Sequence, residues 1–217
     1  MEYWFVQHDI DAYWDRSDAI GSPKARALRD RNFRQMSKGD KVVYYAKQKR
    51  TLGLFEISSE RWLELKSWSR SRKSPHMTYQ IKPIYAGIFE MDPSDFGIGT
   101  TRGRTVIRLT KEQYRMMAAH IFGIEDPENH EGTVALFAKL HKACGFPKLL
   151  KVREAYPDIV AVDESGHEAR IEVEFESANF EREHMNEADK CDAVVCWRDT
   201  WGRAATKPVI ELASLLY

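Results

Sequence analysis

The first half of the chain contains four short runs of aromatic and β-branched residues that are typical of strands. They cover residues 3–6, 42–45, 54–57 and 79–84. The turn signal Gly39-Asp40 comes just before the second run, and a short segment ending in Gly53 leads into the third. We therefore expect the second and third runs to be neighbouring strands of one small sheet.

Two stretches repeat their apolar residues at helical spacing instead. Thr110 and Gln113 have the spacing of a capping box, and the apolar residues that follow predict a helix that runs to about His120. A second helix is predicted to end at Gly145, because glycine is a typical residue at a helix end. Its apolar face consists of Val134, Phe137, Leu140, His141 and Cys144.

The rest of the chain continues with strand patterns around one polar stretch. Strand candidates cover residues 149–152, 159–162, 171–175 and 192–197, and the polar stretch from 179 to about 190 is expected to be helical. The last candidate is a continuous apolar run, which is typical of a strand buried on both faces. The predicted order of the second half is therefore helix, three strands, helix, strand (α-β-β-β-α-β).

The two halves of the chain carry opposite charge. Residues 1–125 contain 22 Lys and Arg against 15 Asp and Glu, a net charge of +7, and residues 126–217 contain 11 against 18, a net charge of −7. The segment 123–129, which contains Pro127, coincides with this change and is the best linker candidate. We therefore predict a mixed α/β chain of two domains, over 1–124 and 129–217. The basic domain would attract a polyanion, although chance distribution over two ordinary surfaces gives the same numbers.

Composition restricts the class of protein. The 217 residues, 43% hydrophobic and 30% charged, are typical of a soluble globular protein. No apolar run approaches the ~20 residues that span a bilayer, and the N-terminal residues do not form a signal peptide. We therefore expect a cytoplasmic protein with no membrane partner. Cys144, Cys191 and Cys196 lack CxxC spacing and are expected to be reduced structural thiols rather than zinc ligands.

Residues 171–176 alternate strictly between apolar and acidic side chains. Because successive strand side chains point to opposite faces, Glu172, Glu174 and Glu176 share one face, roughly 7 Å apart at a rise of about 3.3 Å per residue. Carboxylates this close raise each other's pKa unless solvent or a cation offsets the repulsion, and a divalent metal is one solution. A solvated outer face of the sheet is the other interpretation of the same pattern.

Three neighbouring features favour the metal. Pro157-Asp158 places an aspartate at the start of the preceding strand, and the hairpin signal at 163–166 returns the chain beside it. The next predicted strand, 192–197, has the pattern of a central strand. The acidic strand is therefore not expected at an outer edge.

The order of these features along the chain resembles that of the PD-(D/E)xK nuclease superfamily, over residues 129 to about 201. Pro157-Asp158 corresponds to the Pro-Asp pair of that family, and Glu174-Phe175-Glu176 corresponds to its (D/E)xK, with Glu176 in place of the lysine. The resemblance implies a restriction-endonuclease-like core that hydrolyses phosphodiester bonds with Mg²⁺, or with Mn²⁺ as an alternative. Asp158 and Glu174 would bind the metal, and Glu176 would take a second metal or orient the attacking water.

Several assignments within this resemblance stay open. The pair Glu172 and Glu174 fits the spacing of the motif nearly as well as the pair Glu174 and Glu176. Glu131, on the preceding helix, either completes the metal site or is an ordinary acid in the first turn of a helix. His184 is expected to be structural or to contact phosphate. The missing lysine also leaves open a degenerate fold without activity.

The first half, residues 1 to about 123, resembles the EVE domain, a PUA-like β-barrel fold related to the YTH readers of methylated RNA. The resemblance rests on Tyr3-Trp4, on the segment 31–40 and on the strands at 42–45 and 52–57. It implies that a modified base is flipped into an aromatic pocket, where stacking is worth about 1–3 kcal/mol per base. The expected walls of this pocket are Trp14, Trp62 or Trp68, and, as a weaker candidate, Tyr45. Packing in the core is the alternative role for each aromatic residue.

A basic cluster in the same half is the candidate for nucleic-acid contact. It consists of Arg70, Arg72 and Lys73. Phosphate contacts supply affinity without reading sequence, and a solvated loop is the alternative interpretation.

Together the two resemblances imply a modification-dependent restriction endonuclease. It would bind double-stranded DNA that contains 5-methylcytosine or 5-hydroxymethylcytosine by base flipping and cut it nearby. Because cutting both strands of a duplex needs two active sites, we expect a homodimer. The alternatives are a non-catalytic reader, or an RNA-directed reader, of modified nucleic acid with a degenerate nuclease domain.

Overall fold

The structure is a computed structural model that describes residues 1–8, 17–46, 50–64, 75–99, 105–201 and 205–217. The chain divides into two compact units, Met1–Ile121 and Phe122–Tyr217. This division comes directly before the predicted linker at 123–129. None of the helices within the described ranges is long and apolar enough to cross a membrane.

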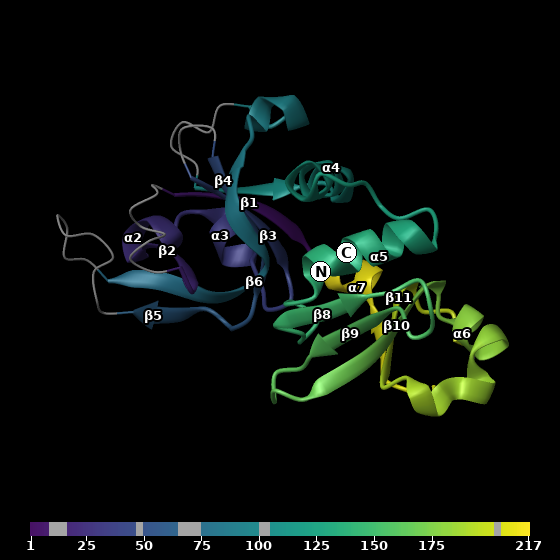
Figure 1. Ribbon diagram of the computed structural model, residues 1–217. Coiled ribbons are helices and arrows are strands. Elements are labelled where there is room, and N and C mark those ends of the chain that lie inside the picture. Colours follow the sequence, from purple (N-terminus) through teal and green to yellow (C-terminus); the bar gives the residue numbers. More distant parts are fainter. Residues whose placement is uncertain (9–16, 47–49, 65–74, 100–104, 202–204) are drawn as a thin grey trace. The chain divides into compact units, whose positions relative to one another are not determined.

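The first unit is built around one large sheet (Figure 1). In chain order its elements are β1 (Tyr3–His8), β2 (Ala19–Pro23), α2 (Lys24–Ala27), α3 (Arg31–Gln35), β3 (Lys41–Ala46), β4 (Arg50–Ile57), β5 (Trp62–Glu64), β6 (His76–Glu90), the 3₁₀ helix η1 (Pro93–Phe96), β7 (Val106–Leu109) and α4 (Lys111–Phe122). The strands follow the spatial order β2-β6-β4-β3-β1-β7, and β5 also pairs with β6. β1 and β3 are parallel, whereas β3 and β4 form an antiparallel pair. The expectation that these two strands are neighbours is confirmed.

The Gly39-Asp40 turn organises the start of this sheet. Gly39 has a positive φ of 91°, which suits glycine. The buried Asp40 carboxylate accepts hydrogen bonds from Trp4 Nε1 at 2.8 Å, from the backbone N–H of Glu2 at 2.8 Å and from that of Ser37 at 3.0 Å. Because a buried carboxylate needs such donors, this one residue fixes β1 beside β3.

Two features of this unit differ from what the sequence predicts. The predicted strand at 79–84 is the middle of the longer β6, which continues through Pro83. Proline is tolerated there because the pairing with β4 shifts register beside it, between Leu54 and Phe55. β2, which pairs with β6, lies in a stretch where the sequence predicted no strand.

Helix α4 has the predicted capping box. The backbone N–H of Gln113 donates to Thr110 Oγ1 at 3.1 Å, and the backbone N–H of Thr110 donates to Gln113 Oε1 at 3.0 Å. The predicted apolar face, which includes Tyr114, Met117 and Ala118, is buried. The two hydrogen bonds satisfy backbone groups that the first turn of a helix leaves without partners.

The second unit is a five-stranded sheet with helices packed against it (Figure 1). Its elements are α5 (His130–Leu140), β8 (Lys148–Val152), β9 (Ile159–Val162), β10 (Glu168–Glu176), α6 (Ala178–Glu183), the 3₁₀ helix η2 (Met185–Lys190), β11 (Ala193–Arg198), β12 (Val209–Glu211) and α7 (Leu212–Leu216). Up to β11 they follow the predicted order of helix, three strands, helix and strand. The helix α5 ends at Leu140 and not at Gly145, because residues 141–145 form turns. Gly145 is the last of these residues and has a positive φ.

The acidic strand β10 lies in the centre of this sheet, in the order β12-β11-β10-β9-β8. It runs antiparallel to β9 and parallel to β11. In the parallel pair Glu172 lies beside Val194, which forms an apolar cluster with Phe180 of α6. Because paired residues point to the same side of a sheet, the face that carries the acids is the face covered by α6. The expectation that β10 is not an outer edge is confirmed.

Candidate functional site

The acids of β10 are buried. Glu172 and Glu174 have exposed fractions of 4% and 6%, and Asp158, just before β9, has 7%. A solvated outer face, which was one interpretation of the alternating pattern, does not describe these residues. Burying three carboxylates in one place is costly unless each is hydrogen-bonded, protonated or neutralised by a cation.

Backbone hydrogen bonds join Asp158 to the acidic strand. β9 and β10 pair Ile159 with Ile171, so the next step of the same register brings Asp158 opposite Glu172. The N–H of Asp158 donates to Glu172 Oε2 at 3.0 Å, and the N–H of Val173 donates to Asp158 Oδ2 at 3.0 Å. Both carboxylates are thus held by donors that belong to the sheet itself.

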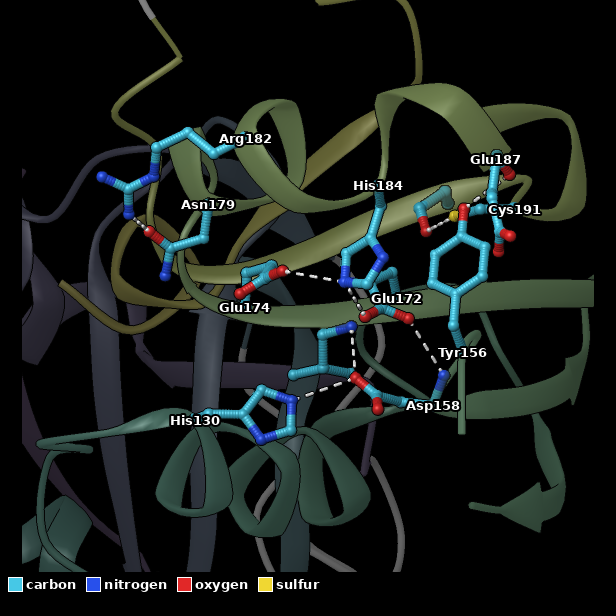
Figure 2. A network of polar contacts seen from close by, with 12 residues as sticks. His130, Tyr156, Asp158, Glu172, Glu174, Asn179, Arg182, His184, Glu187 and Cys191 are labelled. Carbon is cyan, nitrogen blue, oxygen red and sulfur yellow. Dashed lines mark hydrogen bonds and ion pairs between the residues drawn. The ribbon is translucent and has the colours of Figure 1, made fainter. Parts of the chain in front are cut away.

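A histidine from the segment after α6 completes this cluster. His184 Nε2 lies 3.2 Å from Glu172 Oε1 and 3.9 Å from Glu174 Oε1 (Figure 2). The His184 ring stacks on Tyr156, with 4.4 Å between ring centroids and 12° between ring planes. The Tyr156 hydroxyl donates to the backbone carbonyl of Glu187 at 3.0 Å, so the stacking partner is itself anchored.

A second histidine approaches Asp158 from the start of α5. His130 is the first residue of that helix, after the N-cap Asn129, whose side chain accepts from the N–H of Gly132 at 2.9 Å. His130 Nε2 lies 3.1 Å from Asp158 Oδ2 (Figure 2). The Oδ2 atom of Asp158 therefore contacts both the backbone N–H of Val173 and the imidazole of His130.

Burial and like charges raise the pKa of both β10 acids. The pKa of Glu172 is raised to about 8, first by burial and then by the charge of Asp158. The pKa of Glu174 is raised to about 7, again mainly by burial, although a hydrogen bond from Asn179 lowers it in part. Burial alone would lower the pKa of His130, but the hydrogen bond and charge of Asp158 together raise it above its usual value. At neutral pH the cluster therefore either retains a proton or binds a cation.

The geometry fits a divalent cation. Within the described ranges of the chain, the one group of three metal-ligating side chains is Glu172, Glu174 and His184, whose ligand atoms lie within 4.8 Å of one another. Metal–ligand distances of about 2.0–2.2 Å place two ligands of one ion at most about 4.4 Å apart. The two distances from His184 Nε2, 3.2 and 3.9 Å, already meet this limit, so small side-chain movements would suffice for the whole group.

The structure brings together some of the expected nuclease residues and not others. Asp158 and Glu174 lie in the cluster, together with Glu172, the alternative member of the motif. Glu176, two residues past Glu174 at the end of β10, is partly exposed and is not in the group of metal-ligating side chains. It is about 13 Å along the strand from Glu172, and Glu172 is the residue that faces Asp158. The geometry therefore favours the pair Glu172 and Glu174.

Glu131 is exposed on the first turn of α5, while its neighbour His130 contacts Asp158. The placement of Glu131 agrees with the role of an ordinary acidic residue in the first turn of a helix. Sequence reasoning missed His130, because one histidine at a helix start carries no signal of its own. It named His184 without a role in the metal site, because only the fold brings residue 184 back to β10.

Most of the expected reader residues lie outside the described ranges. These are Trp14, Trp68, Arg70, Arg72 and Lys73. Trp62 is half-buried at the start of β5, where it pairs with Thr78 of β6. Tyr45 is 7% exposed and its ring packs against Phe5 at 5.2 Å, so it belongs to the packed interior of the first unit.

Comparisons with known proteins give distant likenesses. No protein-family model matches the chain, and a search of curated proteins finds no match. Among solved structures, the protein Rpa0253 from Rhodopseudomonas palustris is 15% identical with a TM-score of 0.41, over 60% of this chain and 99% of that one. The Mmi1 YTH domain is 16% identical with a TM-score of 0.41, over 54% of this chain and 86% of that one.

A third structure is the YTH domain of the Zygosaccharomyces rouxii MRB1 protein in complex with N6-methyladenosine RNA. It is 11% identical with a TM-score of 0.41, over 57% of this chain and 88% of that one. At these identities and TM-scores the likeness is too distant to carry a fold family or a ligand over to this chain.

Proposed function

We propose that the second unit hydrolyses phosphodiester bonds with the help of a divalent cation, and that the first unit directs it to nucleic acid carrying a modified base. The observation that carries the proposal is the buried cluster of Asp158, Glu172 and Glu174 on adjacent strands, with a histidine on either side. The substrate would be double-stranded DNA with a modified cytosine, which is what the resemblance of the two halves implies.

The energetics of the cluster support a cation. Removing several carboxylates from water costs several kcal/mol per ion, and like charges at this spacing add to that cost. The ionised carboxylates of Glu172, Glu174 and Asp158 carry a charge of −3, of which one divalent cation neutralises two units, and His130 contacts the Asp158 carboxylate. A structural role would be met at lower cost by apolar side chains of similar volume.

Each residue of the cluster has a defined task in this proposal. Glu172 and Glu174 hold the cation, and the backbone N–H of Asp158 keeps the Glu172 carboxylate in place. Asp158, fixed by the N–H of Val173 and by His130, faces the same space and accepts hydrogen bonds from substrate or water. The bound cation would supply charge that polarises the scissile phosphate and makes water a better nucleophile.

The first unit would provide affinity and choice of substrate. Its net charge of +7 over residues 1–125 favours a polyanion. Trp62, half-buried at the edge strand β5, is the described candidate for stacking on a flipped base. Trp14 and Trp68, with the basic cluster at 70–73, remain candidates for the same pocket and for phosphate contact. Cutting both strands would require two copies of the chain, so a homodimer is part of the proposal.

The test is cleavage of matched DNAs that differ in one base. Duplexes with cytosine, 5-methylcytosine or 5-hydroxymethylcytosine are incubated with the full chain and Mg²⁺ or Mn²⁺. We expect cleavage of a modified duplex that Glu172→Gln and Glu174→Gln each reduce by about 100-fold or more, because even changes around a metal ligand cost 10–100-fold. Glu168→Gln, in an exposed acid of the same strand, is the matched control and should cut like the parent.

The same experiment separates the alternatives. Glu176→Gln should retain activity if Glu172 and Glu174 are the pair. A loss of activity in Glu174→Gln and Glu176→Gln, but not in Glu172→Gln, would favour Glu174 and Glu176 instead. An absence of cleavage on every duplex with both metals would reject the nuclease. Binding competition between the modified DNA and RNA that carries N6-methyladenosine then tests the RNA-directed reader. If the chain is such a reader, it should prefer that RNA.

A further inference from the structure

His184 gives the cluster a feature that carboxylates alone do not have. We infer that His184 Nε2 is a direct metal ligand, so that the centre is a two-glutamate, one-histidine site that prefers Mn²⁺ and other transition-metal ions to Mg²⁺. The inference rests on the proposed cation site, but it does not depend on nuclease activity.

The distances place His184 among the ligands. Its Nε2 atom lies 3.2 Å from Glu172 Oε1 and 3.9 Å from Glu174 Oε1, so the nitrogen faces both acids at once. Two ligands of one ion at about 2.0–2.2 Å from it are separated by about 3–4.4 Å. Figure 2 shows the imidazole directed into the space between the two carboxylates.

The backbone and the ring of His184 are both held. His184 lies where α6 ends, with φ −123° and ψ 3°, and its N–H donates to Phe180 O at 2.9 Å. Its carbonyl accepts from the N–H of Glu187 at 2.9 Å. The ring of Tyr156 stacks on the imidazole and fixes its plane, and the Tyr156 hydroxyl donates a hydrogen bond to Glu187 O. A metal ligand gains affinity when its neighbours hold it in the binding orientation.

The chemistry of a nitrogen ligand sets the metal preference. Mg²⁺ favours oxygen ligands, requires near-ideal octahedral geometry and dehydrates reluctantly. Imidazole suits transition metals, and affinity at a given site generally rises from Mn²⁺ through Co²⁺ and Ni²⁺. With Glu172 and Glu174 as oxygen donors, one imidazole shifts the balance away from Mg²⁺ without the sulfur ligands typical of structural zinc. None of the three cysteines belongs to the described group of metal-ligating side chains.

An ion pair is the competing role for His184. A protonated imidazole between the two glutamates would neutralise part of their charge and would leave no need for a metal at that position. The two roles make opposite predictions for the histidine variant. A ligand contributes to metal affinity, whereas a protonated histidine competes with the metal, so that its removal would leave affinity unchanged or increase it.

The experiment measures metal binding directly on the full chain after removal of metals with EDTA. Calorimetric titrations with MnCl₂ and MgCl₂ give the ratio of the two dissociation constants for the parent, for His184→Asn and for His184→Gln. His167→Asn, in an exposed histidine of the β9–β10 turn, is the control. We expect both His184 variants to weaken Mn²⁺ binding about 10-fold or more, with a smaller effect on Mg²⁺. The control should bind both ions like the parent.

Pulsed electron paramagnetic resonance of the Mn²⁺-loaded parent provides a test that needs no variant. A histidine ligand gives a nitrogen modulation, which should be present in the parent and in His167→Asn and absent in His184→Asn. A parent that binds Mn²⁺ without nitrogen coupling, or an unchanged Mn²⁺ to Mg²⁺ ratio in the His184 variants, would overturn the inference. Failure to bind any cation would overturn both the inference and the proposed cation site. Nitrogen coupling without DNA cleavage would reject the nuclease and leave the inference standing.

Discussion

Glu172→Gln should stabilise the metal-free second unit at high pH. The substitution keeps an oxygen that can accept the hydrogen bond from the N–H of Asp158, and it removes a buried carboxylate. The pKa of Glu172 is about 8 in the folded chain against its ordinary value of 4.5. The folded state therefore binds the proton more tightly than the unfolded state does, so stability falls as pH rises from about 4.5 to about 8 and the full penalty is present above pH 8.

The magnitude follows from the shift. At 1.36 kcal/mol per pKa unit, the change from 4.5 to about 8 corresponds to about 5 kcal/mol for Glu172 at high pH. The charge of Glu174, whose own pKa is also raised, contributes to the raised pKa of Glu172, so the two acids are coupled. We expect Glu172→Gln to be more stable than the parent by about 2–5 kcal/mol at pH 8.5 in EDTA. Near pH 5 the difference should be close to zero.

Hydrogen exchange of peptides from β9 and β10 is the suitable assay, because a chain of two units does not unfold in one step. Comparing variant and parent at the same pH cancels the intrinsic exchange rate. Saturating Mn²⁺ should narrow this difference, since a ligand at 100 times its Kd stabilises the parent by about 2.7 kcal/mol and the variant binds it weakly. Equal protection of the two proteins at pH 8.5 in EDTA would refute the electrostatic account of the cluster.

Three further predictions concern the first unit and are measured, for the same reason, by hydrogen exchange of peptides from its strands. Thr78→Val should stabilise it by about 1 kcal/mol, because the buried Thr78 hydroxyl has no hydrogen-bond partner among the described residues; a loss of stability would show that the hydroxyl has a role. Asp40→Ala should cost about 3 kcal/mol or more, because three donors, including Trp4 Nε1, lose their acceptor; a cost below about 1 kcal/mol would contradict the role given to this turn. Gly53→Ala should cost clearly more than Gly39→Ala. Both have positive φ, but an added Cβ at Gly53 would lie 2.1 Å from Tyr85 O, whereas Gly39 has nothing within 4 Å; equal costs would mean that backbone conformation alone matters.

Elements with a strong local signal could be predicted from the sequence. The Thr110 and Gln113 capping box needs four consecutive residues, and both of its hydrogen bonds are present. The alternation over 171–176 likewise gives the correct faces of β10, because the period of a strand is a local property. The length of β6 could not be predicted, because Pro83 is tolerated through a register shift with β4 that depends on tertiary pairing.

The composition of the site depends on contacts that local patterns do not contain. Asp158 and Glu174 could be named from their sequence context, yet His130 and His184 join the cluster from 28 residues before Asp158 and 12 residues after Glu172. Burial is the other missing property. The same acids on a solvated strand would have ordinary pKa values, and only the cover provided by α6 distinguishes the two cases.

The choice between the two acidic pairs shows how a turn determines chemistry. β9 and β10 pair Val162 with Glu168, which leaves five residues, 163–167, in the connection. Within it the Asp163 carboxylate accepts from the N–H groups of Ser165 and His167. Continuing this register for four steps brings Asp158 opposite Glu172. A connection one residue shorter would place Asp158 opposite Ile171 and separate it from every acid of the strand, because a one-residue slip exchanges the faces. The conformation of this five-residue connection therefore decides which carboxylates meet.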